Sequence, residues 1–186
     1  KGILPEQLLA LVDQAHRHGL TVTGHLGSGF RETVNPRDAI AMGIDRVEHF
    51  LGGDAIAGDR PAYASLEDLD AARPEVDAAI EQFLRHRVFF DATLTAYGYF
   101  GEREAAVYED WADERALLTP YARAVVDRSL PRPINRQFEK IYRVKRKTIK
   151  AFYDAGGVDL ITLGTDHPSW GEFFSGFGSH RELHAL

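Results

Sequence analysis

The feature that most constrains the fold of this chain is a regular alternation of helix-like segments with short, strand-like apolar segments. Helical periodicity, proline starts and glycine ends predict helices over residues 5–19, 36–42, 74–86 and 136–155. Each helix is followed by a run rich in aliphatic, β-branched or aromatic residues, at 20–24, 44–48, 87–95 and 158–165. This alternation favours a parallel sheet whose strands are joined by helical crossovers.

The number of these units predicts the size of the fold. Four strand–helix units in 186 residues fill about half of a typical (β/α)₈ barrel of ~250 residues. We therefore expect an α/β fold, half of a TIM-type barrel, as one partial domain over residues 1–186. Residues 96–135 interrupt the alternation after the third strand and are expected to form a helical insertion that covers the substrate, with helices near 103–114 and 119–129.

Composition restricts the class of function. A net charge of −6 argues against a nucleic-acid partner, and the absence of cysteine excludes disulfides and thiolate metal sites. No apolar run approaches the roughly 20 residues of a membrane span, so we expect no membrane partner. The chain starts at Lys1 without an initiator methionine and stops inside a predicted helix, which indicates a piece of a longer protein. Oligomeric state and localisation, cytoplasmic or exported, stay open.

Three residues of metal-binding types follow three of the predicted strands. His25 ends the first strand, His49 the second and Asp166 the fourth. Parallel barrels carry their active sites at these carboxyl ends, and zinc and similar cations accept imidazole and carboxylate ligands while leaving a position open for water. The sequence therefore predicts a hydrolytic metal site made by these residues.

The stretches around these residues resemble the amidohydrolase superfamily, and most of all its imidazolonepropionase-like and prolidase-like branch. The matching stretches are residues 15–25, 43–49, 163–166 and 178–183. The resemblance implies the C-terminal half of the barrel, with His25 and His49 as the fifth- and sixth-strand metal ligands and Asp166 as the eighth-strand residue. It also implies a His-x-His pair on an upstream strand, which none of the four predicted strands carries. A carboxylated lysine is implied as well, and we do not expect Lys1 to be that lysine.

The expected chemistry is hydrolysis of an amide or cyclic amide C–N bond of a small-molecule substrate by a metal-activated water. Asp166 would act as general base and then as general acid, with one or two divalent ions, zinc being the default. Tyr97, His167 and His180 are candidate substrate contacts, for which packing or support of Asp166 is an equally good interpretation. The rival hypothesis is a non-catalytic or truncated barrel fragment that acts through binding or assembly.

The remaining histidines and a basic run are expected to be structural or solvated. This group comprises His16, His18, His86, His184 and the basic residues of 143–150 on the last long helix. Four aromatic residues near the C-terminus are candidates for an apolar pocket wall, with a core role as the alternative: Trp170, Phe173, Phe174 and Phe177.

Overall fold

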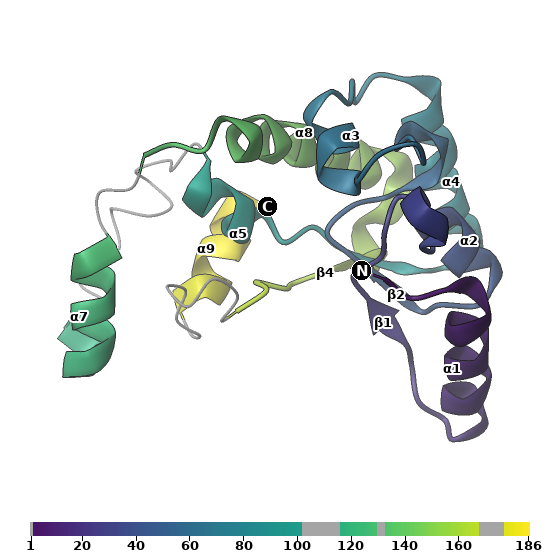
Figure 1. Ribbon diagram of the computed structural model, residues 1–186, viewed down its shortest axis with the longest axis horizontal. Coiled ribbons are helices and arrows are strands. Elements are labelled where there is room, and N and C mark those ends of the chain that lie inside the picture. The colour runs from purple at the N-terminus through teal and green to yellow at the C-terminus, as the bar shows by residue number, and fades with distance from the viewer. Residues whose placement is uncertain (1, 102–115, 130–132, 168–176) are drawn as a thin grey trace. The chain divides into compact units, whose positions relative to one another are not determined.

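A computed structural model describes residues 2–101, 116–129, 133–167 and 177–186 (Figure 1). The chain divides into two compact units, which we name the sheet unit (Lys1–Ala92 with Val144–Thr162) and the helical unit (Thr93–Arg143 with Leu163–Leu186). Among the described residues, no helix has the length and apolar character that crossing a bilayer requires. Lys1, Trp170, Phe173, Phe174 and the helix expected at 103–114 lie outside the described residues.

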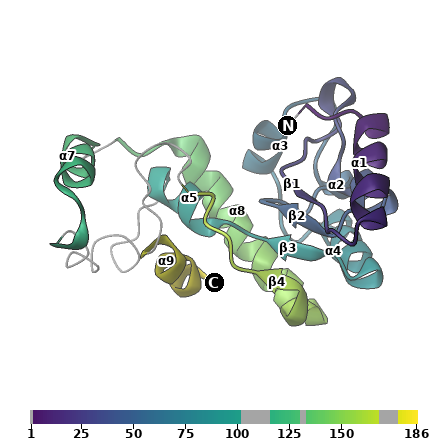
Figure 2. The same ribbon diagram turned by 90° about the horizontal axis from the view of Figure 1, so that it is seen from below.

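The sheet unit contains four parallel strands in sequential order, as the alternating pattern predicted (Figure 2). They are β1 (Thr23–Gly24), β2 (Arg46–Glu48), β3 (Phe89–Asp91) and β4 (Ile161–Thr162). Each strand is shorter than predicted because the hydrogen-bonded ladder covers only two or three residues. The predicted fourth strand is wrong over its first residues, since Val158–Leu160 forms the 3-10 turn η5.

Helices before and between the strands cover one face of this sheet. They are α1 (Pro5–Arg17), α2 (Pro36–Ala41), α4 (Pro74–His86) and the end of α8 (Arg136–Phe152), and α1 contacts α2, which contacts α4. The buried centre is aromatic: the rings of Phe83, Phe90 and Phe152 lie 5.4 to 5.9 Å apart. Val47 lies beside Phe90 in the strand register and is equally buried. Helix α4 begins and ends where the sequence predicted.

The other face of the sheet is polar at its first two strands. Because side chains alternate along a strand, Thr23, Arg46 and Glu48 lie opposite the helix-covered row. Arg46 donates from Nε to Thr23 Oγ1 at 3.0 Å and to Glu48 Oε1 at 3.2 Å, and the Thr23 hydroxyl donates to Glu48. The polar groups on this face thus bind one another.

Short elements occupy the loops of the sheet unit. These are η1 (Phe30–Glu32), η2 (Gly53–Ala55), α3 (Ala62–Glu67) and the π-helical turn η4 (Tyr153–Gly157) that follows α8. Helix α3 lies in a stretch for which the sequence predicted no element.

The helical unit contains α5 (Leu94–Phe100), α7 (Pro120–Ser129), the first half of α8, and α9 (Phe177–Ala185). Helix α7 matches the helix predicted at 119–129. The strand predicted to run through residue 95 is wrong at its end, because Leu94 begins α5. Glu182 of α9 explains the change: its buried carboxylate accepts hydrogen bonds from the backbone N–H groups of Leu94 and Thr95, both at 2.7 Å. An acidic group at the N-terminus of a helix accepts hydrogen bonds from N–H groups that have no partner within the helix.

A substitution at Gly52 tests how tightly the loop after β2 packs on α2. Gly52 has a φ of 70°, and a Cβ there would meet the ring of Pro36 at 2.5 Å, whereas Gly156, with a φ of 91°, has nothing within 4 Å of its Cβ position. Both alanine variants acquire backbone strain, but only Gly52→Ala adds overpacking, which costs about 1–3 kcal/mol more. We expect urea denaturation to show this larger loss for Gly52→Ala. Equal losses in the two variants would contradict the packing described here.

Candidate functional site

His25 and His49 lie side by side at the carboxyl ends of neighbouring strands. His25 follows β1 directly and His49 follows β2 directly. Their ring centroids are 4.4 Å apart with the planes at 67°, and His49 is buried while His25 is partly exposed. The structure therefore brings together two of the three residues that the sequence predicted as metal ligands.

The backbone of His49 is held on both sides. Its φ of 74° lies in the left-handed region. Its N–H donates to the carbonyl oxygen of Asp91 at 2.7 Å, and its own carbonyl accepts a hydrogen bond from the ammonium group of Lys145. Strained backbone of this kind costs of order 1–3 kcal/mol and is concentrated at functional sites. These contacts fix the point at which the His49 side chain leaves the sheet.

The burial of Lys145 contradicts one prediction from the sequence. The basic residues of 143–150 were expected on a solvated helix face, and Arg146 and Lys147 are indeed exposed. Lys145 is instead only 2% exposed. Lysine is almost never fully buried unless it is paired, and here it donates to the peptide of a candidate metal ligand.

Left-handed backbone recurs beyond β3 and β4. Thr93, two residues beyond β3, has a φ of 50°, and Asp166, four residues beyond β4, has a φ of 54°. Aspartate tolerates this conformation better than most residues. His49 and Asp166 thus share an unusual backbone conformation just beyond a strand, which is the position where parallel α/β folds place functional groups.

Asp166 is exposed and belongs to the helical unit, whereas the two histidines belong to the sheet unit. Over residues 2–101, 116–129, 133–167 and 177–186, no three His, Asp or Glu side chains form a group that could hold a metal ion. The two adjacent imidazoles fit part of a ligand set for a zinc-type cation. The assignment of Asp166 as a further ligand, and as the catalytic residue, stays a prediction.

A pocket of about 250 Å³ opens beside His25. The loop after β1 forms one side of it and the start of α3 the other, and its lining includes His25, Phe30, Arg31 and Tyr63. The ring of His25 lies 6.3 Å from that of Tyr63. The candidate metal ligand is therefore also a wall of a cavity in the sheet unit.

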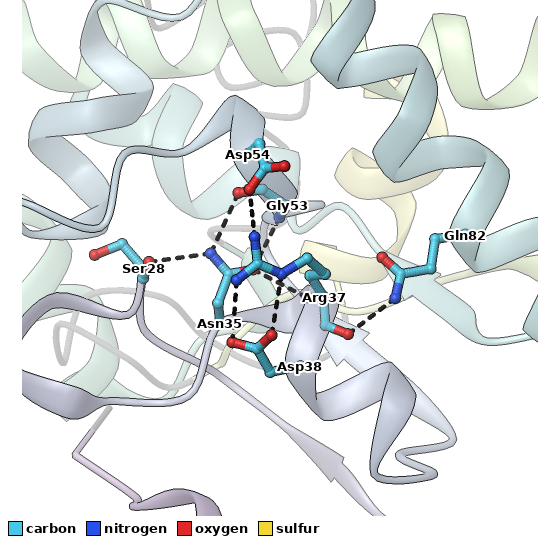
Figure 3. A network of polar contacts seen from close by, with 7 residues as sticks. All are labelled: Ser28, Asn35, Arg37, Asp38, Gly53, Asp54 and Gln82. Atoms are coloured by element: carbon cyan, nitrogen blue, oxygen red, sulfur yellow. Dashed lines mark hydrogen bonds and ion pairs between the residues drawn. The ribbon is translucent and has the colours of Figure 1, made fainter.

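The buried side chain of Asn35 joins the loops that carry the two histidines (Figure 3). Its amide nitrogen donates to the carbonyls of Ser28, at 3.0 Å, and Gly53, at 3.3 Å. Its amide oxygen accepts from the N–H of Gly53 and from that of Arg37, both at 2.9 Å. The Arg37 bond caps the N-terminus of α2. Asn35 thus ties the segment after His25 to the segment after His49.

Arg37 extends this network at the surface (Figure 3). Its guanidinium binds Asp38, with Nε 3.0 Å from Oδ1, and also binds Asp54 of η2. The hydrogen bond to Asp38 contributes most to raising the pKa of Arg37, against the opposing effect of burial. Gln82 of α4 donates to the Arg37 carbonyl at 2.9 Å, so three elements meet at this residue.

The three predicted substrate contacts all lie in the helical unit. Tyr97 is buried and stacks on Phe138, with ring centroids 5.5 Å apart. His180 is exposed on α9. His167 is half-buried; burial and the Arg181 guanidinium lower its pKa, and the Asp166 carboxylate partly opposes this. A role for any of the three in binding substrate stays a prediction.

The four histidines expected to be structural or solvated are exposed: His16, His18, His86 and His184. His16 Nε2 lies 3.0 Å from Asp45 Oδ2. The sequence reasoning missed Lys145, Asn35 as a link between loops, and Arg31. Only Lys145 left a readable signal, because it falls on the apolar stripe of α8 with Ile141 and Ile149.

Comparison with known proteins places the fold. No protein-family model matches the chain, and no curated protein sequence matches it. A solved structure of an amidohydrolase shares the fold over 99% of this chain, with a TM-score of 0.54 and 22% identity. That protein is bottromycin amidohydrolase, and the chain spans 40% of its length.

Proposed function

We propose that this chain is the C-terminal half of a metal-dependent amidohydrolase barrel that hydrolyses amide or cyclic amide C–N bonds. The observation that carries the proposal is the pair of imidazoles, 4.4 Å apart, at the carboxyl ends of adjacent parallel strands. Sequential strand order supports the barrel, and the fold shared with bottromycin amidohydrolase supports the class of reaction. The imidazolonepropionase-like branch stays a prediction, as does a covering role for residues 96–135.

In this proposal His25 and His49 hold a divalent cation through neutral imidazole nitrogens, zinc being the default metal. A divalent cation supplies a water of lowered pKa and polarises a carbonyl group bound next to it. Because neutral ligands leave the charge of the cation uncancelled, they favour this chemistry. The bonds that Asp91 and Lys145 make to the His49 backbone keep one ligand oriented.

Asp166 would move the proton. An exposed carboxylate can accept a proton at an oxygen from the attacking water and return it to the leaving nitrogen. The chain offers no cysteine for nucleophilic catalysis, and hydrolysis by an activated water does not require one. The φ of 54° at Asp166 would set the direction in which its side chain leaves the backbone.

The test is metal content in the longest natural chain that contains residues 1–186. We expect elemental mass spectrometry to find one or two equivalents of zinc, manganese or iron, with a clear loss in His25→Ala and in His49→Asn. Asparagine is chosen at His49 because it tolerates the φ of 74°. His86→Ala, at an exposed helix end, is the matched control and should keep its metal.

Unchanged metal in both site variants would remove the two histidines as ligands. No metal in the parent protein, even after zinc is added back, would instead favour the rival hypothesis of a non-catalytic fragment that acts through binding or assembly.

A further inference from the structure

The pocket beside His25 has walls of two kinds. Its volume of about 250 Å³ is slightly below the ~300–1,000 Å³ of cavities that enclose drug-sized ligands. Apolar groups form most of its surface, among them Leu26, Phe30, Pro61 and Tyr63. A cavity of this size and lining fits one apolar side chain of a substrate rather than a whole large ligand.

The side chain of Arg31 adds a positive charge to the lining of this pocket. Its guanidinium carbon lies 5.0 Å from the centroid of the Phe30 ring, and the residue is exposed. Several arginines of the sheet unit pair with carboxylates, as Arg37 does with Asp38 and Arg60 with Asp68. Within the part of the chain that the structure describes, Arg31 has no such ion pair. Its guanidinium therefore has donors available for a ligand.

The backbone presents Arg31 in an uncommon conformation. Arg31 has a φ of 55° and Glu32 a φ of 63°, so two consecutive residues other than glycine adopt left-handed backbone inside η1. Such conformations cost free energy and persist where the surroundings determine them. The turn is held at its ends, since Thr33 donates from its hydroxyl to the Phe30 carbonyl at 2.8 Å.

From this arrangement we infer that the pocket selects substrates that carry a carboxylate next to an apolar side chain. The inference rests on the proposed function, because His25 would place the scissile amide at one end of the pocket. The substrate class is then an N-acyl amino acid or the C-terminal residue of a peptide. Its free carboxylate pairs with the Arg31 guanidinium, which can bind a carboxylate through two parallel hydrogen bonds. Its side chain lies against Leu26, Phe30 and Tyr63.

Two compounds that differ only in the carboxylate test the inference. N-acetylphenylalanine has the amide, the ring and the carboxylate, whereas N-acetylphenethylamine lacks the carboxylate alone. Calorimetry on the longest natural chain, with and without added zinc, should show tighter binding of N-acetylphenylalanine by roughly 10- to 100-fold. In Arg31→Met we expect this ratio to fall close to one, with Arg31→Lys between the two. Arg85→Met, at an exposed arginine on α4, should keep the parent ratio.

The outcomes separate this inference from the proposed function. Equal binding of the two compounds by the parent protein, or a ratio that Arg31→Met leaves unchanged, would overturn the role of Arg31. Carboxylate binding that depends on Arg31, in a protein that neither holds metal nor hydrolyses either compound, would support the pocket and overturn the proposed hydrolase activity. Hydrolysis with a kcat/KM preference for the carboxylate that Arg31→Met abolishes would support both.

Discussion

Replacing Asp166 by asparagine should lower the turnover of an amide substrate by roughly 10²- to 10⁴-fold, because it removes the proton acceptor. The change is nearly isosteric, the side chain is exposed, and asparagine tolerates a φ of 54° as aspartate does. We therefore expect the thermal midpoint to change little. Steady-state kinetics and a thermal melt on the same preparations measure the two quantities.

Asp159→Asn is the matched control, since Asp159 is an exposed aspartate just before β4. Full activity in Asp166→Asn would remove Asp166 from the mechanism. Metal content measured alongside separates its two predicted roles: a proton carrier alone leaves the metal in place, whereas a ligand does not.

The second large effect is expected at Lys145. Lys145→Met keeps most of the length and apolar stem of the buried side chain but removes the hydrogen bond to the His49 carbonyl. Loss of a group that orients a metal ligand lowers metal affinity or activity by about 10- to 100-fold. We expect zinc competition against a chromophoric chelator to show a decrease in this range.

Lys147→Met is the control, because Lys147 is exposed on the same helix and should keep the parent affinity. A Lys145→Met protein that binds zinc as tightly as its parent would show that the contact supports the fold alone. Because the buried His49 carbonyl loses its donor, we expect Lys145→Met to lose some stability whether or not its zinc affinity falls. Denaturation of both variants measures this loss separately from zinc affinity.

Elements with strong local signals could be predicted from the sequence. Helix α4 starts at a proline and carries Val76, Ala79, Ile80 and Phe83 on one face, and these residues are buried. Helix α5 could not be predicted, because its first turn lies in a β-branched run and its N–H groups bind Glu182, 87 and 88 residues away. A contact so distant in sequence leaves no local pattern.

The candidate site likewise contains parts that the sequence indicates and parts that it does not. The meeting of His25 and His49 follows from two strand ends and parallel pairing, both of which the sequence indicates. Lys145 was assigned to the solvated face because its neighbours are charged, although its spacing from Ile141 and Ile149 places it on the buried face. The unpaired guanidinium of Arg31 depends on which acidic groups lie near it in space, and a sequence alone does not reveal this.

The bonding of Asn35 has a consequence for how such a site could diversify. Every partner of its amide group described above is a backbone atom, in Ser28, Arg37 and Gly53. Backbone groups are present whatever side chain a position carries. Side chains in the two loops can therefore be substituted while the hydrogen bonds to Asn35 remain. Residues such as Arg31 could therefore vary under selection for new substrates without loosening the histidines, which makes this loop the natural place to randomise in a library for altered specificity.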